Sequence, residues 1–442
     1  MADLKLASIK PWAPHRQAAP VTERPGDALS VASNGTRTCV GGWQLEFSDA
    51  VAGEAYSVCW DIDYEGIARP ADMLECLAYW GEISRDSSRR RDSAIASWSY
   101  LLPERTGPRH LRFSRVLKVP EGVDRLTLRC TFRWSAEGKA VWQLPRIESV
   151  PRPASPAPVK IAVATGRAGS RRRRFTCIQD NLDFYVPLCE AACQHAPNLI
   201  VLPEIALQDG IPGSALDRAV PAPGPETDVF AELCRKHGVR ILLGMLERNG
   251  DAVHNSAVLM APDGGIDGKY RKVHLAVGNE MDSGILPGDG FPVFQTEIGR
   301  VGCNICMDTS AAESSRMVGL NGADFLLMPI MGDFRAHHPE AHVFDPDRFR
   351  AIMQTHAMDN QVCMVVSVNR AEGSCIVDRL GNVLAWNDGG QDMIQAEVAL
   401  DDGLRPANRG CARAVTWMLR RPHVYSAFVD PDNKGHLPET AY

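Results

Sequence analysis

Three short stretches, far apart in the chain, each carry one reactive side chain after or within an apolar run. Glu204 follows the run Leu199 to Leu202, Lys272 lies after Tyr270-Arg271, and Cys306 ends the run that begins at Val301. An amide carbon is a poor electrophile, so its cleavage needs a nucleophile, a base and positive charge or donors for the oxyanion. A thiol, a carboxylate and an ammonium group supply these functions. The sequence therefore predicts cysteine-dependent cleavage of a carbon–nitrogen bond, provided that the three side chains meet.

The chemistry of each group suggests its role. A free thiol with a pKa of about 8.5 is only a few per cent ionised at pH 7, so the nucleophile Cys306 needs a base, which we assign to Glu204. Lys272 would place positive charge beside the tetrahedral oxyanion. The backbone N–H of Met307, directly after the nucleophile, would donate to the same oxygen.

The elements that must position these residues follow a βα alternation after residue 158. Strand candidates are 159–164, 199–202, 241–245, 256–260, 301–306, 325–328 and 362–368, and helix candidates are 178–193, 229–237, 311–321 and 347–360. Open α/β sheets bind ligands at the carboxyl ends of their strands. We therefore expect an α/β domain of layered sheets that brings Glu204, Lys272 and Cys306 together at one end.

The first part of the chain has a different periodicity. Apolar and polar residues alternate over 126–134, and short runs of the same kind recur between turn signals over 38–150. This pattern predicts an all-β, jelly-roll-like sandwich. We interpret its tryptophans as core residues, with sugar binding as the alternative. Residues 1–37 are Pro-rich and aperiodic and are expected to form an extended arm, with disorder as the alternative, and residues 151–158 are expected to form a stiff, extended linker.

Composition limits the classes of function. The chain has 442 residues, a net charge of −6 and 13 cysteines, and hydrophobic residues make up 45%. We expect two domains, reduced thiols, a cytoplasmic location, and no binding to nucleic acid or membrane. The basic run 171–174 is interpreted as a solvated loop, with contact to an anionic ligand as the alternative. No cofactor or metal is expected.

Two further groups of residues have alternative interpretations. Cys303 and Cys306 have the spacing of a redox or zinc pair, but a zinc site needs two more ligands and the sequence offers no second pair. We interpret Cys303 as a buried strand residue. The histidines at 337, 338 and 342 are expected in a surface loop, and substrate contact is the alternative.

Several motifs carry a resemblance to a known family. They are Gly268 to Leu275, Pro287-Gly288-Asp289, His254-Asn255-Ser256-Ala257, Ala357 to Asn360 and Gly373 to Asp378. With Glu204, Lys272 and Cys306, they make residues 159 to about 425 resemble the nitrilase, or carbon–nitrogen hydrolase, superfamily, followed by a tail at 426–442. The resemblance implies a four-layer αββα fold, a Glu-Lys-Cys triad and assembly into a homodimer or larger homo-oligomer. It also adds Glu280, eight positions after the lysine, to the catalytic set.

The flanking residues bear on the substrate. Asp308 agrees with the amidase branch, whereas Ala311-Ala312-Glu313 stand where amidase-like members commonly carry Phe-Pro-Glu. The resemblance also places Asp308 and Met331 at the substrate pocket, and for Met331 an ordinary core methionine is the alternative. We expect an amidase that releases ammonia or an amine from a small amide through a thioester. A nitrilase, an N-carbamoyl hydrolase or an amide-forming acyltransferase are the alternatives, and a non-catalytic binding or scaffold protein on a hydrolase fold is the alternative of another class.

Overall fold

The chain forms two compact units in a computed structural model. The structure describes residues 4–83, 95–166, 175–338, 340–400, 409–430, 432–433 and 435, so the basic run 171–174 lies outside the described residues. One unit comprises Met1–Ser155 and Asp402–Tyr442, and the other comprises Pro156–Asp401.

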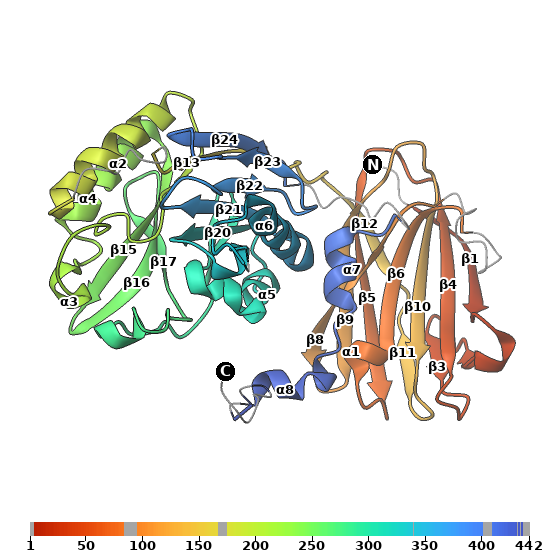
Figure 1. Cartoon of the computed structure of the whole chain (residues 1–442). Coiled ribbons are helices and arrows are strands. Elements are labelled where there is room, and N and C mark those ends of the chain that lie inside the picture. Colours follow the sequence, from red (N-terminus) through yellow and green to blue (C-terminus); the bar gives the residue numbers. More distant parts are fainter. Residues whose placement is uncertain are drawn as a thin grey trace. The chain divides into compact units, whose positions relative to one another are not determined.

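The first unit is a sandwich of two antiparallel sheets (Figure 1). The first sheet has the order β1 (Lys5–Trp12), β4 (Val40–Ser48), β10 (Leu126–Arg133), β6 (Leu74–Gly81) and β7 (Ile95–Tyr100). The second has the order β2 (Val21–Glu23), β3 (Leu29–Ala32), β11 (Lys139–Trp142), β5 (Ala55–Glu65), β9 (His110–Lys118) and β8 (Leu102–Gly107), with β12 (Arg146–Val150) also paired to β5. The predicted β-sandwich is confirmed. Four of its tryptophans, Trp43, Trp60, Trp80 and Trp142, lie in the core, as the packing interpretation requires. That interpretation is wrong for Trp134, which is 42% exposed, and Trp98 is only partly buried.

The prediction of an N-terminal arm over 1–37 is wrong. The strand β1 pairs with β4 along its length, and β2 and β3 belong to the second sheet. β1 is an edge strand, where a proline such as Pro11 is tolerated because one side of the strand needs no ladder partner. The prolines therefore hid a strand that the sandwich accommodates at its border.

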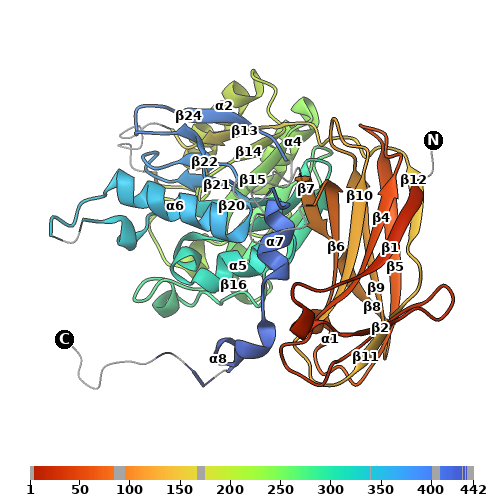
Figure 2. The same cartoon turned by 90° about the vertical axis from the view of Figure 1, so that its right-hand side faces the viewer.

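The C-terminal segment also differs from the predicted domain boundary at 425. Helix α7 (Ala412–Met418) belongs to the first unit, where Figure 2 shows it beside β7. The Cys411 N–H donates to the Trp98 carbonyl at 3.0 Å, and Val415 packs with Tyr100 in a small apolar cluster. The first unit also holds α1 (Pro70–Met73) and α8 (Ser426–Val429). Burial of the apolar face of α7 on the sandwich edge explains why the second unit ends at Asp401.

The second unit has two six-stranded sheets (Figure 1). The first has the order β17 (Ile266–Arg271), β16 (Ala252–Met260), β15 (Arg240–Asn249), β14 (Leu199–Val201), β13 (Val159–Ala164) and β24 (Met393–Val398). The second has the order β18 (Val293–Thr296), β19 (Gly299–Cys303), β20 (Phe325–Ile330), β21 (Cys363–Val368), β22 (Cys375–Val377) and β23 (Val383–Trp386). In each sheet three central strands are parallel, and their continuous apolar runs are typical of strands buried on both faces.

Three apolar clusters show how the layers stack. Side chains of both sheets, such as Val201 and Phe325, share one cluster between the sheets. Helices α2 (Ile178–Cys193) and α4 (Pro225–His237) cover the first sheet, and α5 (Ala312–Leu320) and α6 (Pro346–Asn360) cover the second. The remaining helix is the short α3 (Ala215–Arg218). The predicted αββα order is confirmed.

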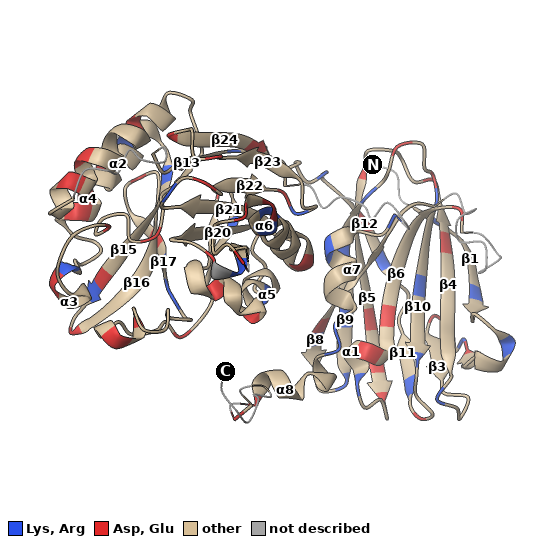
Figure 3. Cartoon of the chain, viewed as in Figure 1, with Lys and Arg blue, Asp and Glu red and all other residues tan. Residues whose placement is uncertain are grey.

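The centre of this unit carries little charge. In Figure 3 the strands β20 and β21 are free of Lys, Arg, Asp and Glu along their whole length. Charged groups that do enter the interior therefore need specific partners, because an unpaired buried charge is costly. Over the described part of the chain, no helix combines the length and the apolar character needed to cross a membrane.

Candidate active site

The predicted reactive residues lie just beyond the ends of strands. Glu204 follows β14, and Lys272 follows β17 directly, so both come from the first sheet. Cys306 begins the 3-10 helix at Cys306–Ser310, beyond the end of β19 in the second sheet. The expected strand over 301–306 therefore stops at Cys303, and Cys306 lies in the turn that follows. Glu280 directly precedes the 3-10 turn Met281–Ser283.

The Lys272 ammonium lies between two buried carboxylates. Its Nζ is 3.0 Å from Glu204 Oε1 and 2.7 Å from Glu280 Oε2, and the three residues are only 1%, 2% and 6% exposed, respectively. Burial by itself would lower the pKa of Lys272, but the negative charges of Glu204 and Glu280 outweigh it and hold the pKa above its ordinary value of 10.5. The lysine is therefore a fixed cation at neutral pH.

Asn255 joins the same two carboxylates. This fully buried residue on β16 donates through Nδ2 to Glu204 Oε1 at 2.8 Å and to Glu280 Oε1 at 2.6 Å. Backbone N–H groups complete the set, because Met331 donates to Glu204 Oε2 at 2.7 Å and Ala276 to Glu280 Oε2 at 2.7 Å. Sequence reasoning gave Asn255 no role. Its only signal was its place in the His-Asn-Ser-Ala motif.

The Cys306 thiol meets this cluster at the turn after β20. Its Sγ donates to the Gly332 carbonyl at 3.4 Å, and the preceding residue, Met331, is the backbone donor to Glu204. Burial, followed by repulsion from Glu204 and opposed by Lys272, raises the pKa of Cys306 to about 12. The thiol is therefore protonated at neutral pH, and it would need a base to act as a nucleophile.

The backbone at Cys306 is strained. Its φ of +45° lies in the left-handed region that side chains other than glycine rarely adopt. Thr309 supports the turn, since its Oγ1 donates to the Cys306 carbonyl at 2.9 Å and to Asp333 Oδ2 at 3.2 Å. In this conformation the Cys306 side chain reaches the residues after β20, where its Sγ contacts the Gly332 carbonyl.

Asp308 has a different place from the predicted substrate pocket. Its side chain is fully buried and accepts from Tyr270 Oη at 2.6 Å, from the Ile305 N–H at 2.8 Å and from the His274 N–H at 3.0 Å. The hydrogen bond to Asp308, which outweighs burial, raises the pKa of His274. Asp308 thus ties the segment that follows Lys272 to the turn at Cys306–Ser310, and it is absent from the residues that line the neighbouring cavity.

A cavity of about 630 Å³ opens beside the nucleophile turn. Its walls are Val273, His274, Leu275, Met281, Ile285, Pro287, Met307, Ser310 and Ala311. Met307, predicted as an oxyanion donor, borders this cavity. Met331, predicted at the pocket, is 43% exposed and touches the site through its backbone.

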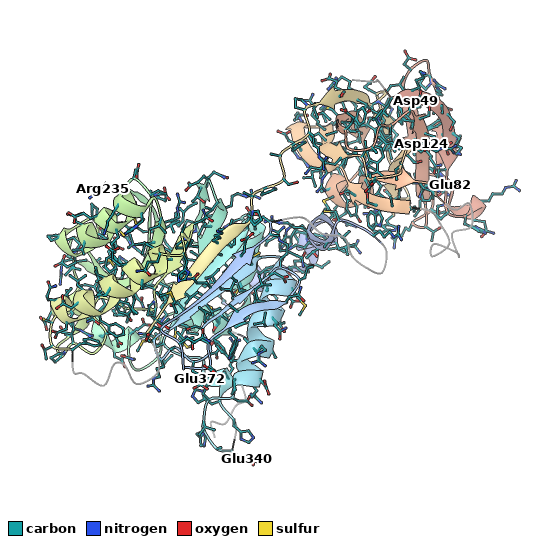
Figure 4. The ribbon with its side chains drawn as sticks, turned by 90° about the horizontal axis from the view of Figure 1, so that it is seen from above. Asp49, Glu82, Asp124, Arg235, Glu340 and Glu372 are labelled. Carbon is teal, nitrogen blue, oxygen red and sulfur yellow. The ribbon has the colours of Figure 1, made fainter. Side chains whose placement is uncertain are left out.

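The loop between β20 and α6 carries the three histidines. His338 is exposed and accepts from the backbone N–H groups of Glu340 and Ala341, and His337 packs edge-on against Phe344. Figure 4 shows Glu340 at the tip of this projecting loop. These contacts agree with the surface-loop interpretation. Cys303, by contrast, is fully buried in β19, and the described residues contain no cluster of three or more His, Cys, Asp or Glu able to hold a metal ion.

Comparisons with known proteins agree with this geometry. The model of the carbon-nitrogen hydrolase family matches residues 162–404. A citrullinase from Francisella tularensis is 30% identical over 188 residues, which are 39% of this chain and 65% of that protein, just under two thirds. An (R)-stereoselective amidase from a Pseudomonas species is 32% identical over 231 residues, which are 50% of this chain and 79% of that protein. The crystal structure of a carbon-nitrogen hydrolase from Helicobacter pylori shares the fold, with a TM-score of 0.50 at 22% identity over 62% of this chain and 99% of that chain.

Proposed function

Because the chain belongs to the carbon–nitrogen hydrolase family, we propose that it is an amidase that cleaves a small-molecule amide through a thioester on Cys306. The observation that carries the proposal is the Lys272 ammonium held between Glu204 and Glu280 beside the thiol. A fixed cation, a carboxylate and a protonated thiol are the groups that acyl transfer from nitrogen to sulfur requires.

The reaction begins when Glu204 takes the proton of the Cys306 thiol and the sulfur attacks the substrate carbonyl carbon. The oxyanion that forms is stabilised by the Lys272 ammonium and by the Met307 N–H. Glu204 then gives its proton to the leaving nitrogen, and ammonia or an amine departs as the thioester forms. Water attacks the thioester, and Glu204 takes a proton from it. The carbon–sulfur bond then breaks, the acid leaves, and Glu204 returns the proton to the sulfur of Cys306.

Glu280 and Asn255 contribute to these reaction steps indirectly. Glu280 holds Lys272 through a 2.7 Å ion pair, and Asn255 fixes the two carboxylates relative to each other through its hydrogen bonds to both. A preorganised charge costs no rearrangement when the oxyanion appears, which is the main source of such stabilisation.

The choice of an amide over a nitrile or carbamoyl substrate is supported by the Pseudomonas amidase among the similar proteins. The similarity to the citrullinase supports the alternative of an N-carbamoyl hydrolase, since the name of that protein denotes an enzyme acting on citrulline. Mass spectrometry of the Cys306 adduct separates these substrates, because acyl, carbamoyl and thioimidate groups differ in mass. Homo-oligomer formation and a cytoplasmic location stay predictions.

The test replaces Cys306 with alanine. Hydrolysis of primary amides should fall by roughly a thousandfold or more, because the nucleophile is lost while the fold is kept. Cys177, which is exposed, provides the matched control, and Cys177→Ala should retain activity. Equal hydrolysis by the Cys306→Ala variant and the wild type would refute the mechanism. Failure of a thiol-reactive probe to label Cys306 would favour a binding protein on a hydrolase fold.

A further inference from the structure

We propose that the cavity beside Met307 receives an apolar group of the substrate, and that Ala311 sets how large this group can be. The inference rests on the proposed amidase function and names the substrate class: amides that carry an aromatic or branched apolar group. Small polar amides would leave the cavity unfilled.

The walls of the cavity indicate this preference. Apart from His274 and Ser310, every lining residue is apolar. Met281, one of them, is 59% exposed, so the cavity presents apolar surface to water. A ligand group that covers such surface gains free energy in proportion to the apolar area removed from water. The volume of about 630 Å³ lies within the range of about 300–1,000 Å³ that is typical of small-molecule sites.

The cavity lies next to the proposed catalytic residues. Its lining includes Val273, the residue after Lys272, and Met307, the residue after Cys306. The reactive side chains themselves are absent from the lining residues. The cavity therefore suits the part of a substrate that extends away from the scissile bond, while the carbonyl lies at the thiol.

Ala311 controls the volume of the cavity. It lies between the 3-10 helix Cys306–Ser310 and α5, and its side chain at the wall is a single methyl group. Its backbone has a φ of −95° and a ψ of 104°, a conformation open to any L residue. A larger side chain at this position could be accommodated by the backbone and would project into space that a substrate would otherwise occupy.

The neighbouring Ala312 offers a matched control. It is exposed, begins the same helix α5 and is absent from the cavity wall. Ala311→Phe and Ala312→Phe add the same side chain one residue apart, and the melting temperatures of both variants show whether each is folded.

The experiment measures kcat/KM for phenylacetamide and for acetamide. The wild type should favour phenylacetamide, and its preference should fall at least about tenfold in Ala311→Phe but stay within about twofold in Ala312→Phe, since even one methylene changes discrimination by roughly 10- to 200-fold. An unchanged preference in a folded Ala311→Phe, or a wild type that favours acetamide, would overturn the proposal.

A binding measurement separates this proposal from the proposed function. Calorimetry on the Cys306→Ala variant should show binding of phenylacetamide that is weakened by Ala311→Phe and not by Ala312→Phe. If this binding is found but the wild type hydrolyses no amide, the cavity assignment stands and the amidase function fails. If acetamide is hydrolysed but the binding is absent or insensitive to residue 311, the amidase function stands and the cavity assignment fails.

Discussion

Replacing Asn255 with alanine should move the pH dependence of catalysis as well as stability. Asn255 Nδ2 donates to one oxygen of Glu204 at 2.8 Å and to one oxygen of Glu280 at 2.6 Å, and all three side chains are buried. A hydrogen bond to a charged group contributes about 1.5–3 kcal/mol to stability. Alanine removes both donors, so the charged form of each carboxylate loses a contribution of this size.

The magnitude follows from the energy of one such bond. About 1.5 kcal/mol, at 1.36 kcal/mol for each pH unit, corresponds to a shift of roughly one unit, and 3 kcal/mol to about two. A carboxylate that loses a donor to its charged form is protonated more readily. Protonation prevents Glu204 from acting as the base. The acidic limb of the kcat/KM profile should therefore move to higher pH by about one to two units.

The assay is the pH profile of kcat/KM, with urea unfolding of the same variant. Ser256→Ala is the matched control, because Ser256 is the next residue on β16, is equally buried and donates to another carboxylate, Glu247, at 2.8 Å. That variant should lose stability and keep the acidic limb of the wild type. A wild-type limb in Asn255→Ala, or the same shift in Ser256→Ala, would refute the positioning role.

Two further predictions concern the neighbours of Lys272. Glu280→Gln removes one of the charges that hold the pKa of Lys272 above 10.5, so the alkaline limb of kcat/KM should move to lower pH by about 1–3 units; an unmoved limb in profiles measured up to pH 11 would contradict this. Tyr270→Phe removes the 2.6 Å bond to Asp308 and should lower the free energy of unfolding by about 1.5–3 kcal/mol in urea titrations; an unchanged unfolding midpoint and slope would show that this bond contributes nothing.

Much of the architecture could be predicted from local patterns. The apolar runs of the second unit become buried strands, and the alternation over 126–134 becomes β10 of the sandwich. The sequence pattern did not predict β1, because its proline argues against a central strand but is tolerated in an edge strand. It also failed for α7, whose place depends on an apolar patch at Trp98 and Tyr100, far away in the chain.

The candidate site, too, could be predicted from the sequence only in part. The identity and order of Glu204, Lys272 and Cys306 were determined by the sequence, because a thiol, a base and a cation suit one kind of chemistry whatever holds them. The sequence could not decide that Asp308 is a buried support or that Asn255 bridges the two carboxylates. Both roles depend on which atoms meet after the strands have packed, and hydrogen bonding is decided by distance and direction in three dimensions.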